Sequence, residues 1–235
     1  SKIRQRDGQT SMLFGGDVAF NHSNNTTQTT SEKESYTNGL TYNNNDSTFR
    51  QGHTFDTRVR LELDYQIDSL NKLILRPTIA YTDSRSISYN EYANTRLDTA
   101  EEQSLTTISD GYQNRLNQSA DINAALNAIY SHKFLKLGRS LSMNASIDFT
   151  NNKGYARTYA WDNLGDSARV NQFTHSGNNS LNYSLKASYV EPIYGKNHFL
   201  ETSLSFSHRL RDNDKRQYRD SACTDLDSVY SNRFV

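Results

Sequence analysis

Strict alternation of apolar and charged residues from Phe55 to Tyr65 is the feature that most constrains the fold of this chain. Apart from Thr57, every second residue from Phe55 onward is apolar, and the residues between them are Asp, Arg or Glu. Side chains on a β-strand point to opposite faces with a period of two, so this pattern gives one apolar and one charged face. The segment has the length of a tilted transmembrane strand, about 9–11 residues, and aromatic rings at both ends. The sequence therefore predicts a two-faced β-strand that is long enough to cross a membrane.

The same alternation recurs along the rest of the chain. Short turns are expected at 68–71, 136–139 and 191–196, and each joins two such segments into a hairpin. The further predicted strands are 12–20, 73–81, 122–130, 141–149, 181–189 and 200–206. Pro77 lies inside one of them, where it removes a ladder hydrogen bond, so we expect a bulge or kink at that point.

Long polar stretches separate these hairpins. They cover about 21–51, 83–117, 151–177 and 209 to the end, and we expect them to be connections without regular structure. Connections of that length are uncommon in compact domains but are typical of outer-membrane barrels, in which short periplasmic turns alternate with long external loops. The sequence thus predicts an all-β chain: an antiparallel transmembrane β-barrel segment of about seven to eight strands, with residues 1–235 forming one architectural unit.

The alternation assigns each strand residue to lipid or to the barrel lumen. We expect the apolar residues to face the lipid of the outer membrane and the polar residues to face the lumen. The predicted lipid-facing residues are Phe55, Val59, Leu61, Leu63, Tyr65, Leu73, Leu75, Ile79, Tyr81, Ile122, Leu126, Tyr130, Leu141, Met143, Ile147, Phe149, Leu181, Tyr183, Leu185, Tyr189, Leu200, Leu204 and Phe206. The predicted lumen-facing residues are Asp56, Arg58, Arg60, Glu62, Asp64, Asn144, Asp148 and Lys186.

Composition argues against several other classes of protein. Only 34% of residues are hydrophobic and 22% are charged, which is little apolar material for a soluble core but suits a barrel with a wet lumen. The 26 basic and 26 acidic residues are mixed, which gives no electrostatic footprint for nucleic acid. Cys223 is the single cysteine, the six histidines are scattered, and no catalytic or phosphate-binding motif occurs. We therefore expect no catalytic, cofactor-binding or metal-binding residue, and no enzymatic activity.

Four segments carry a resemblance to a known family: Leu63–Leu73, Leu75–Tyr81, Tyr189–Pro192 and Gly195–Leu200. They resemble strand-and-turn signatures from the barrel region of TonB-dependent receptors, above all the Asn/Ser/Tyr-rich type of gut and oral anaerobes. The resemblance extends over most of the chain from about Phe55 onward. It implies a cell outer-membrane barrel of about 22 strands that imports a scarce nutrient. It also implies an N-terminal plug and a TonB-type energy-transducing partner, neither of which is recognisable in this sequence, so we interpret the chain as part of a larger barrel.

Two other functions compete with uptake through a receptor. One is a passive porin or a small outer-membrane barrel with a structural or adhesive role. The other is a soluble, secreted β-protein that binds glycans. The sequence leaves open the transported ligand, the total number of strands, any partner lipoprotein and the oligomeric state.

Overall fold

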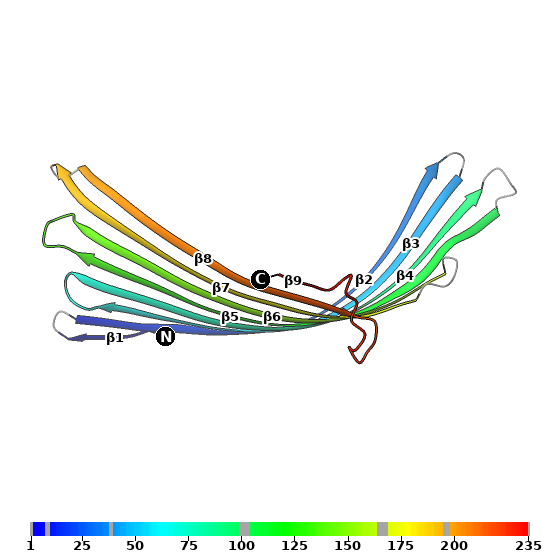
Figure 1. Cartoon of the computed structure of the whole chain (residues 1–235), viewed down its shortest axis with the longest axis horizontal. Coiled ribbons are helices and arrows are strands. Elements are labelled where there is room, and N and C mark those ends of the chain that lie inside the picture. Colours follow the sequence, from blue (N-terminus) through cyan, green and yellow to red (C-terminus); the bar gives the residue numbers. More distant parts are fainter. Residues whose placement is uncertain are drawn as a thin grey trace.

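The computed structural model describes residues 2–7, 10–37, 40–98, 104–163, 169–194 and 198–234, and these residues form a single antiparallel β-sheet. The order of the strands in the sheet is their order in the sequence, so each strand pairs with the next one along the chain (Figure 1). The prediction of an all-β antiparallel chain is confirmed. The strands are β1 (Lys2–Asp7), β2 (Thr10–Thr37), β3 (Leu40–Gln66), β4 (Asn71–Asp98), β5 (Ser104–Lys133), β6 (Ser140–Asp162), β7 (Arg169–Tyr194), β8 (His198–Tyr218) and β9 (Asn232–Phe234).

Seven of these strands, β2 to β8, are 21–30 residues long, and two short strands flank them. They form a twisted sheet that bows along its length, as Figure 1 shows. Within the described residues the sheet is open, because β1 pairs only with β2 and β9 only with β8. The number of long strands agrees with the predicted seven to eight.

Two of the predicted short turns lie within the described residues, at the same end of the sheet (Figure 1). In the turn between β3 and β4, the Asp68 carboxylate accepts hydrogen bonds from the amide nitrogens of Leu70 and Asn71, each at 2.7 Å. In the turn between β5 and β6, Gly138 has a φ of 84°, a left-handed conformation that glycine adopts without steric cost. Part of the third predicted turn, residues 195–197, lies outside the described residues.

The expectation that the long polar stretches lack regular structure is wrong for most of their described residues. Residues 219–231, between β8 and β9, lie outside the strands as expected, and 38–39, 99–103 and 164–168 are outside the described residues. Residues 83–98 continue β4, and 104–117 belong to β5; likewise β2 and β3 pair without interruption from His22 opposite Phe55 up to Thr37 opposite Leu40. A backbone ladder that has already formed holds the next residues of both strands close together. Each further pair therefore adds almost no entropic cost of loop closure. Backbone pairing does not need apolar side chains. The polar halves of these strands therefore extend the same sheet.

Pro77 interrupts the sheet in a different way from the one expected. The pairing between β3 and β4 has a gap of two residues on each strand, where Leu61 lies opposite Pro77 and Glu62 lies opposite Arg76. The register is the same on both sides of this gap. The pairing of Pro77 with Leu126 on the other side is continuous. The predicted bulge is absent, because proline can simply leave its missing donor unpaired on one side without adding a residue to the strand.

The sheet has hardly any interior. Among the described residues, Phe173 is the one buried hydrophobic side chain, whereas Phe20, Ile79 and Leu204 are 71%, 57% and 76% exposed. A single layer of strands cannot bury its apolar side chains against itself. Those side chains need a cover that is not part of this sheet.

Candidate functional site

The apolar side chains gather on one face of the sheet. Residues that lie directly opposite each other on neighbouring strands share a face, so the register shows which side chains lie together. Phe14, Leu63 and Leu75 form one such row, and Leu126, Ile147 and Tyr183 form another, two residues further along the strands. The register places every predicted lipid-facing residue on this apolar face. That they touch lipid remains a prediction.

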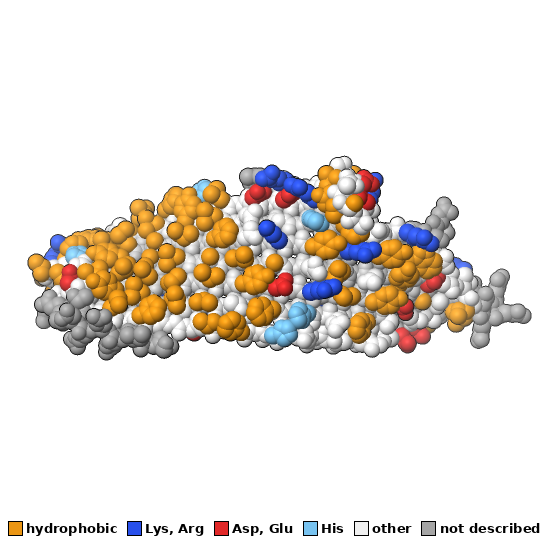
Figure 2. All heavy atoms as spheres, turned by 90° about the horizontal axis from the view of Figure 1, so that it is seen from below, with side chains coloured by type: hydrophobic (Ala, Val, Ile, Leu, Met, Phe, Trp, Pro, Cys, Tyr) orange, Lys and Arg blue, Asp and Glu red, His pale blue; other side chains and the backbone are white. Residues whose placement is uncertain are grey.

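On each long strand the apolar side chains are concentrated in one part of the length. Figure 2 shows the hydrophobic side chains crowded over the half of the sheet that carries the short turns, while charged and histidine side chains appear over the other half. We call this region the apolar belt. Its limits are 12–20 in β2, 55–65 in β3, 73–81 in β4, 122–130 in β5, 141–149 in β6, 181–189 in β7 and 200–210 in β8.

The opposite face of the belt is polar. All the predicted lumen-facing residues lie on it, and many of its side chains bond across the strands. The carboxylate of Asp56 accepts hydrogen bonds from Thr82 at 2.8 Å and Asn21 at 3.4 Å, and the Asn127 amide donates to Asn144 at 2.8 Å. Further along the strands, the hydroxyls of Ser84 and Ser119 lie 2.9 Å apart. These ladders of amides, carboxylates and hydroxyls suit a surface in contact with water.

The charged residues of β3 form only part of the ion-pair network that could line a lumen. Asp64 pairs with Lys72 at 2.8 Å, and Glu62 pairs with Arg76 at 3.5 Å. Arg58 and Arg60 are exposed, and no side-chain hydrogen bond or ion pair joins either guanidinium to another described residue. These two guanidinium groups are therefore available to something outside this sheet.

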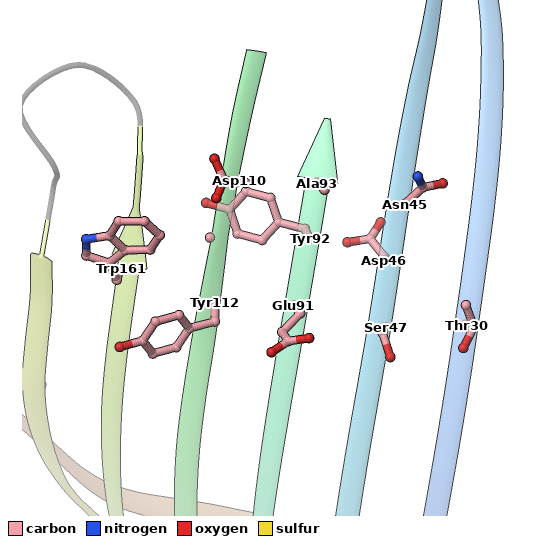
Figure 3. A pocket seen from close by; sticks show the side chains of 11 residues that line it. Thr30, Asn45, Asp46, Ser47, Glu91, Tyr92, Ala93, Asp110, Tyr112 and Trp161 are labelled. Atoms are coloured by element: carbon pink, nitrogen blue, oxygen red, sulfur yellow. The ribbon is translucent and has the colours of Figure 1, made fainter. Parts of the chain in front are cut away.

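A hollow of about 420 Å³ lies on the continuation of the apolar face beyond the belt (Figure 3). Glu91 follows the belt residue Tyr81 by ten positions without a register shift, so its side chain points to the same side. Glu91 shares a row with Ser47, Tyr112 and Trp161. The hollow is lined by Thr30, Asn45, Asp46, Ser47, Glu91, Tyr92, Ala93, Asp110, Gly111, Tyr112 and Trp161.

Four aromatic rings meet at the edge of this hollow, and we call them the aromatic cluster: Tyr89, Tyr112, Tyr159 and Trp161. The ring centroid of Tyr112 lies 6.0 Å from those of Tyr159 and Trp161 and 6.1 Å from that of Tyr89. In Figure 3 the rings of Tyr112 and Trp161 lie side by side, projecting from β5 and β6. The sequence pattern did not predict this cluster, because the polar segments that contain these rings were expected to be loops; the alternation of Tyr159 with Trp161 was the available signal.

Gly111 allows the strands to approach closely beside the cluster. A Cβ atom on Gly111 would lie 2.7 Å from the hydroxyl of Tyr92 and would also collide with the carbonyl oxygen of Trp161. Because Gly111 has no side chain, Tyr92 can reach across it and donate a hydrogen bond to Asp162 at 2.5 Å. This hydrogen bond to a carboxylate raises the pKa of Tyr92 to about 12.

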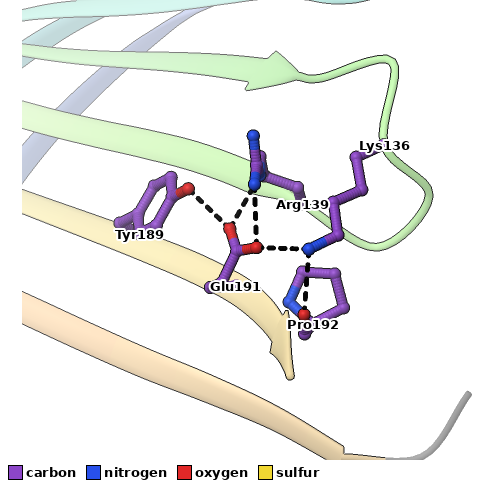
Figure 4. Close-up of polar contacts among 5 residues, drawn as sticks. All are labelled: Lys136, Arg139, Tyr189, Glu191 and Pro192. Atoms are coloured by element: carbon purple, nitrogen blue, oxygen red, sulfur yellow. Dashed lines mark hydrogen bonds and ion pairs between the residues drawn. The ribbon is translucent and has the colours of Figure 1, made fainter. Parts of the chain in front are cut away.

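A charged cluster fixes the turn between β5 and β6 to the end of β7 (Figure 4). The Glu191 carboxylate accepts hydrogen bonds from Arg139 at 2.7 and 2.8 Å, from Lys136 at 2.5 Å and from the hydroxyl of Tyr189 at 2.7 Å. Lys136 also donates to the carbonyl oxygen of Pro192 at 3.1 Å. The Arg139 guanidinium, followed by the other donors, holds the pKa of Glu191 well below its usual range.

No metal-binding arrangement is found in the part of the chain that the structure describes. It contains no group of three or more His, Cys, Asp or Glu side chains that could hold a metal ion. Cys223 is a free thiol whose sulfur lies 3.6 Å from Nε2 of His175. No helix among the described residues is long and apolar enough to span a membrane.

Comparison with known proteins identifies no family for this chain. No family model matches it, and no curated protein matches it. Three solved structures show weak likeness. The match to the ferric citrate transporter FecA has a TM-score of 0.29 and 9% sequence identity, and covers 99% of this chain and 38% of that chain. The match to the membrane pore complex of pneumolysin has a TM-score of 0.16 and 8% identity, with 95% and 64% of the two chains covered, and the match to the beta domain of the Bordetella autotransporter BrkA has a TM-score of 0.13 and 7% identity, with 83% and 97% covered. This chain thus spans about 38% of the transporter's length. All three TM-scores are too low to support a function, and the fold and its two faces define the chain only as a bowed, single-layer antiparallel β-sheet.

Proposed function

We propose that this chain forms part of the wall of a transport barrel in the outer membrane, with the apolar face against lipid and the polar face towards the lumen. The apolar belt carries this proposal. On every long strand the belt covers nine to eleven residues. At about 3.3 Å per residue and a tilt of about 40°, nine residues rise roughly 23 Å, close to the height of about 25 Å of the apolar band of such barrels.

The exposure of the apolar belt favours a protein whose apolar face is covered by lipid and disfavours a soluble protein. Soluble monomers rarely expose apolar patches of more than a few hundred Å². Here large apolar side chains on all seven long strands are at least one-third exposed on one face, among them Val18, Ile79, Ile147 and Leu204. Tyrosines lie at the short-turn limit of the belt on three strands, at Tyr65, Tyr130 and Tyr189, as in the aromatic girdle of a membrane interface.

The open edges of the sheet favour a larger barrel. An unpaired strand edge cannot lie in the hydrocarbon region, because its free backbone groups would have no partners. Most of β8, including all of its belt residues, lacks a partner on its outer side within the described residues. We infer that further strands close the wall, which accords with the many-stranded barrel that the resemblance to TonB-dependent receptors implies.

That resemblance also gives the more specific form of the proposal. It implies energised import of a scarce nutrient, with an N-terminal plug and a TonB-type protein as partners. Arg58 and Arg60 on the polar face would be available to the plug or to the nutrient. The chain's own residues would supply the scaffold of the pathway and no reaction, in keeping with the expectation that it is not an enzyme.

The single cysteine offers a test of the orientation. Cys223 lies beyond the end of β8, at the opposite end of the sheet from the short turns. Intact cells that make the whole protein should label Cys223 with a membrane-impermeant thiol reagent. In a Cys223→Ser background, Leu135→Cys places a thiol in the turn between β5 and β6, where the native side chain is 93% exposed. This variant should react only after the outer membrane is permeabilised. Equal labelling of the native protein at Cys223 and of the Leu135→Cys variant on intact cells would overturn the proposed orientation.

Two further measurements separate the competing functions. The purified whole protein should partition into detergent and change its gel mobility on heating; a soluble glycan-binding protein would do neither. A plugged receptor should give no steady conductance steps in a planar bilayer. Stepwise open-channel conductance would instead favour the passive porin.

A further inference from the structure

The aromatic cluster and the hollow beside it form a surface with two kinds of recognition group. The rings of Tyr112, Tyr159 and Trp161 are half-buried, so each is held in place by its neighbours and still offers part of its area. Tyr112 is inclined by only 30° to Trp161 and 38° to Tyr159, so the three rings form a shallow strip across β5 and β6. No residue of the belt is needed to build it.

The polar groups around the strip are mainly hydrogen-bond acceptors. Glu91 is exposed, and Asp110, which the register places on the same face, also lines the hollow; together they supply two carboxylates. Asn45, Ser47 and Thr30 add amide and hydroxyl groups on the far side. Arg169, next to Trp161 in the register, is the one cation in this row. The acidic balance disfavours an anionic ligand and suits a ligand rich in hydroxyl donors.

We propose that this hollow binds a neutral carbohydrate. A pyranose ring has faces of C–H groups, which pack on the negative faces of aromatic rings, and a rim of hydroxyl groups, which donate to carboxylates and amides. The strip of rings and the row of acceptors beside it match those two surfaces. A volume of about 420 Å³ is within the size range of small-molecule sites.

The location of the hollow defines the possible sources of such a ligand. Ten residues along β4 separate Glu91 from the last belt residue, Tyr81, a path of about 33 Å along the strand. If the proposed function holds, the hollow lies outside the lumen and above the outer leaflet. The sugar could then belong to a glycolipid of that leaflet or to a free oligosaccharide. Binding of carbohydrate itself does not depend on the membrane location, so the two proposals can fail separately.

The experiment uses the whole protein in detergent and an array of neutral oligosaccharides, followed by titration with the best one. Trp161 is the only tryptophan of the chain, so the difference between the fluorescence of the native protein and of Trp161→Phe reports directly on the hollow. We expect Trp161→Ala and Tyr112→Ala each to weaken binding at least about tenfold, and Trp161→Phe to retain most of it because a ring remains. Tyr36→Ala removes an aromatic side chain that is 73% exposed elsewhere in the sheet, and should leave binding unchanged.

A second arm tests the acceptors and the source. Glu91→Gln keeps the shape of the side chain and should weaken binding severalfold, while sialylated or sulfated oligosaccharides should bind more weakly than neutral ones. Nanodiscs with and without glycolipid then show whether the sugar of a neighbouring lipid occupies the hollow. Absence of binding to every neutral sugar, a preference for anionic sugars, or unchanged binding by Trp161→Ala would each overturn the proposal.

Discussion

The Arg139 guanidinium donates a hydrogen bond to each carboxylate oxygen of Glu191, with Nε 2.7 Å from one oxygen and Nη2 2.8 Å from the other. The two residues are 52 positions apart, and this pair joins the turn after β5 to the end of β7. Two parallel hydrogen bonds of this kind fix orientation as well as distance. The contact sets the geometry of the sheet at the end where the short turns lie.

The pair should make stability depend on pH in the acidic range. Because the pKa of Glu191 is lowered in the folded protein, its contribution is fully present above the usual glutamate pKa and is lost as the pH falls below it. Thermal unfolding of the native protein should therefore shift to lower temperature between about pH 5 and pH 3. Glu191→Gln should be less stable at neutral pH and lose part of that shift. Glu201→Gln, which changes an exposed carboxylate in β8, serves as the control.

Leu61 and Arg60 are neighbours on opposite faces, and they test the assignment of the apolar face to lipid. Leu61→Arg should cost about 2–4 kcal/mol in a membrane-folding assay if the residue lies near the middle of the bilayer. Arg60→Ala, on the polar face, should cost much less. Similar costs for both variants in urea titrations with lipid vesicles would contradict the assigned facing.

Gly111 should tolerate no side chain. Gly111→Ala would force a Cβ atom against the carbonyl oxygen of Trp161 and the hydroxyl of Tyr92, and overpacking of this kind costs about 1–3 kcal/mol. The control is Gly177→Ala, also within a strand, because nothing lies within 4 Å of a Cβ atom at that position. Denaturant midpoints should fall for the first variant and stay nearly constant for the second.

The hydrogen bond from Tyr92 to Asp162 should be visible at alkaline pH. Since the pKa of Tyr92 is raised to about 12, its stabilising contribution is complete below the usual tyrosine pKa of 10 and disappears as the pH rises towards 12. Ultraviolet titration should show a late step of tyrosine ionisation near pH 12, and Tyr92→Phe should reduce that step. Tyr230→Phe, which changes a tyrosine that is 58% exposed, should leave that late step in place.

Much of the architecture follows from local alternation. A period of two forces Val59 and Leu63 to one face and Arg60 and Asp64 to the other, whatever the rest of the chain does. Turn signals at Asp68 and Gly138 then fixed where the chain reverses. The length of the strands was not predictable in this way, because the hydrophobic alternation weakens beyond the belt while the backbone pairing continues to Thr37 and Asp98.

The sequence by itself determined the two faces of each strand, since side-chain direction on a strand depends only on parity. Only the tertiary structure decided which residues of different strands meet, because register depends on pairing across the whole sheet. It brought Tyr112 of β5 beside Tyr159 and Trp161 of β6, and it joined Arg139 to Glu191. Those contacts link residues about 50 positions apart, and no pattern within a single strand specifies them.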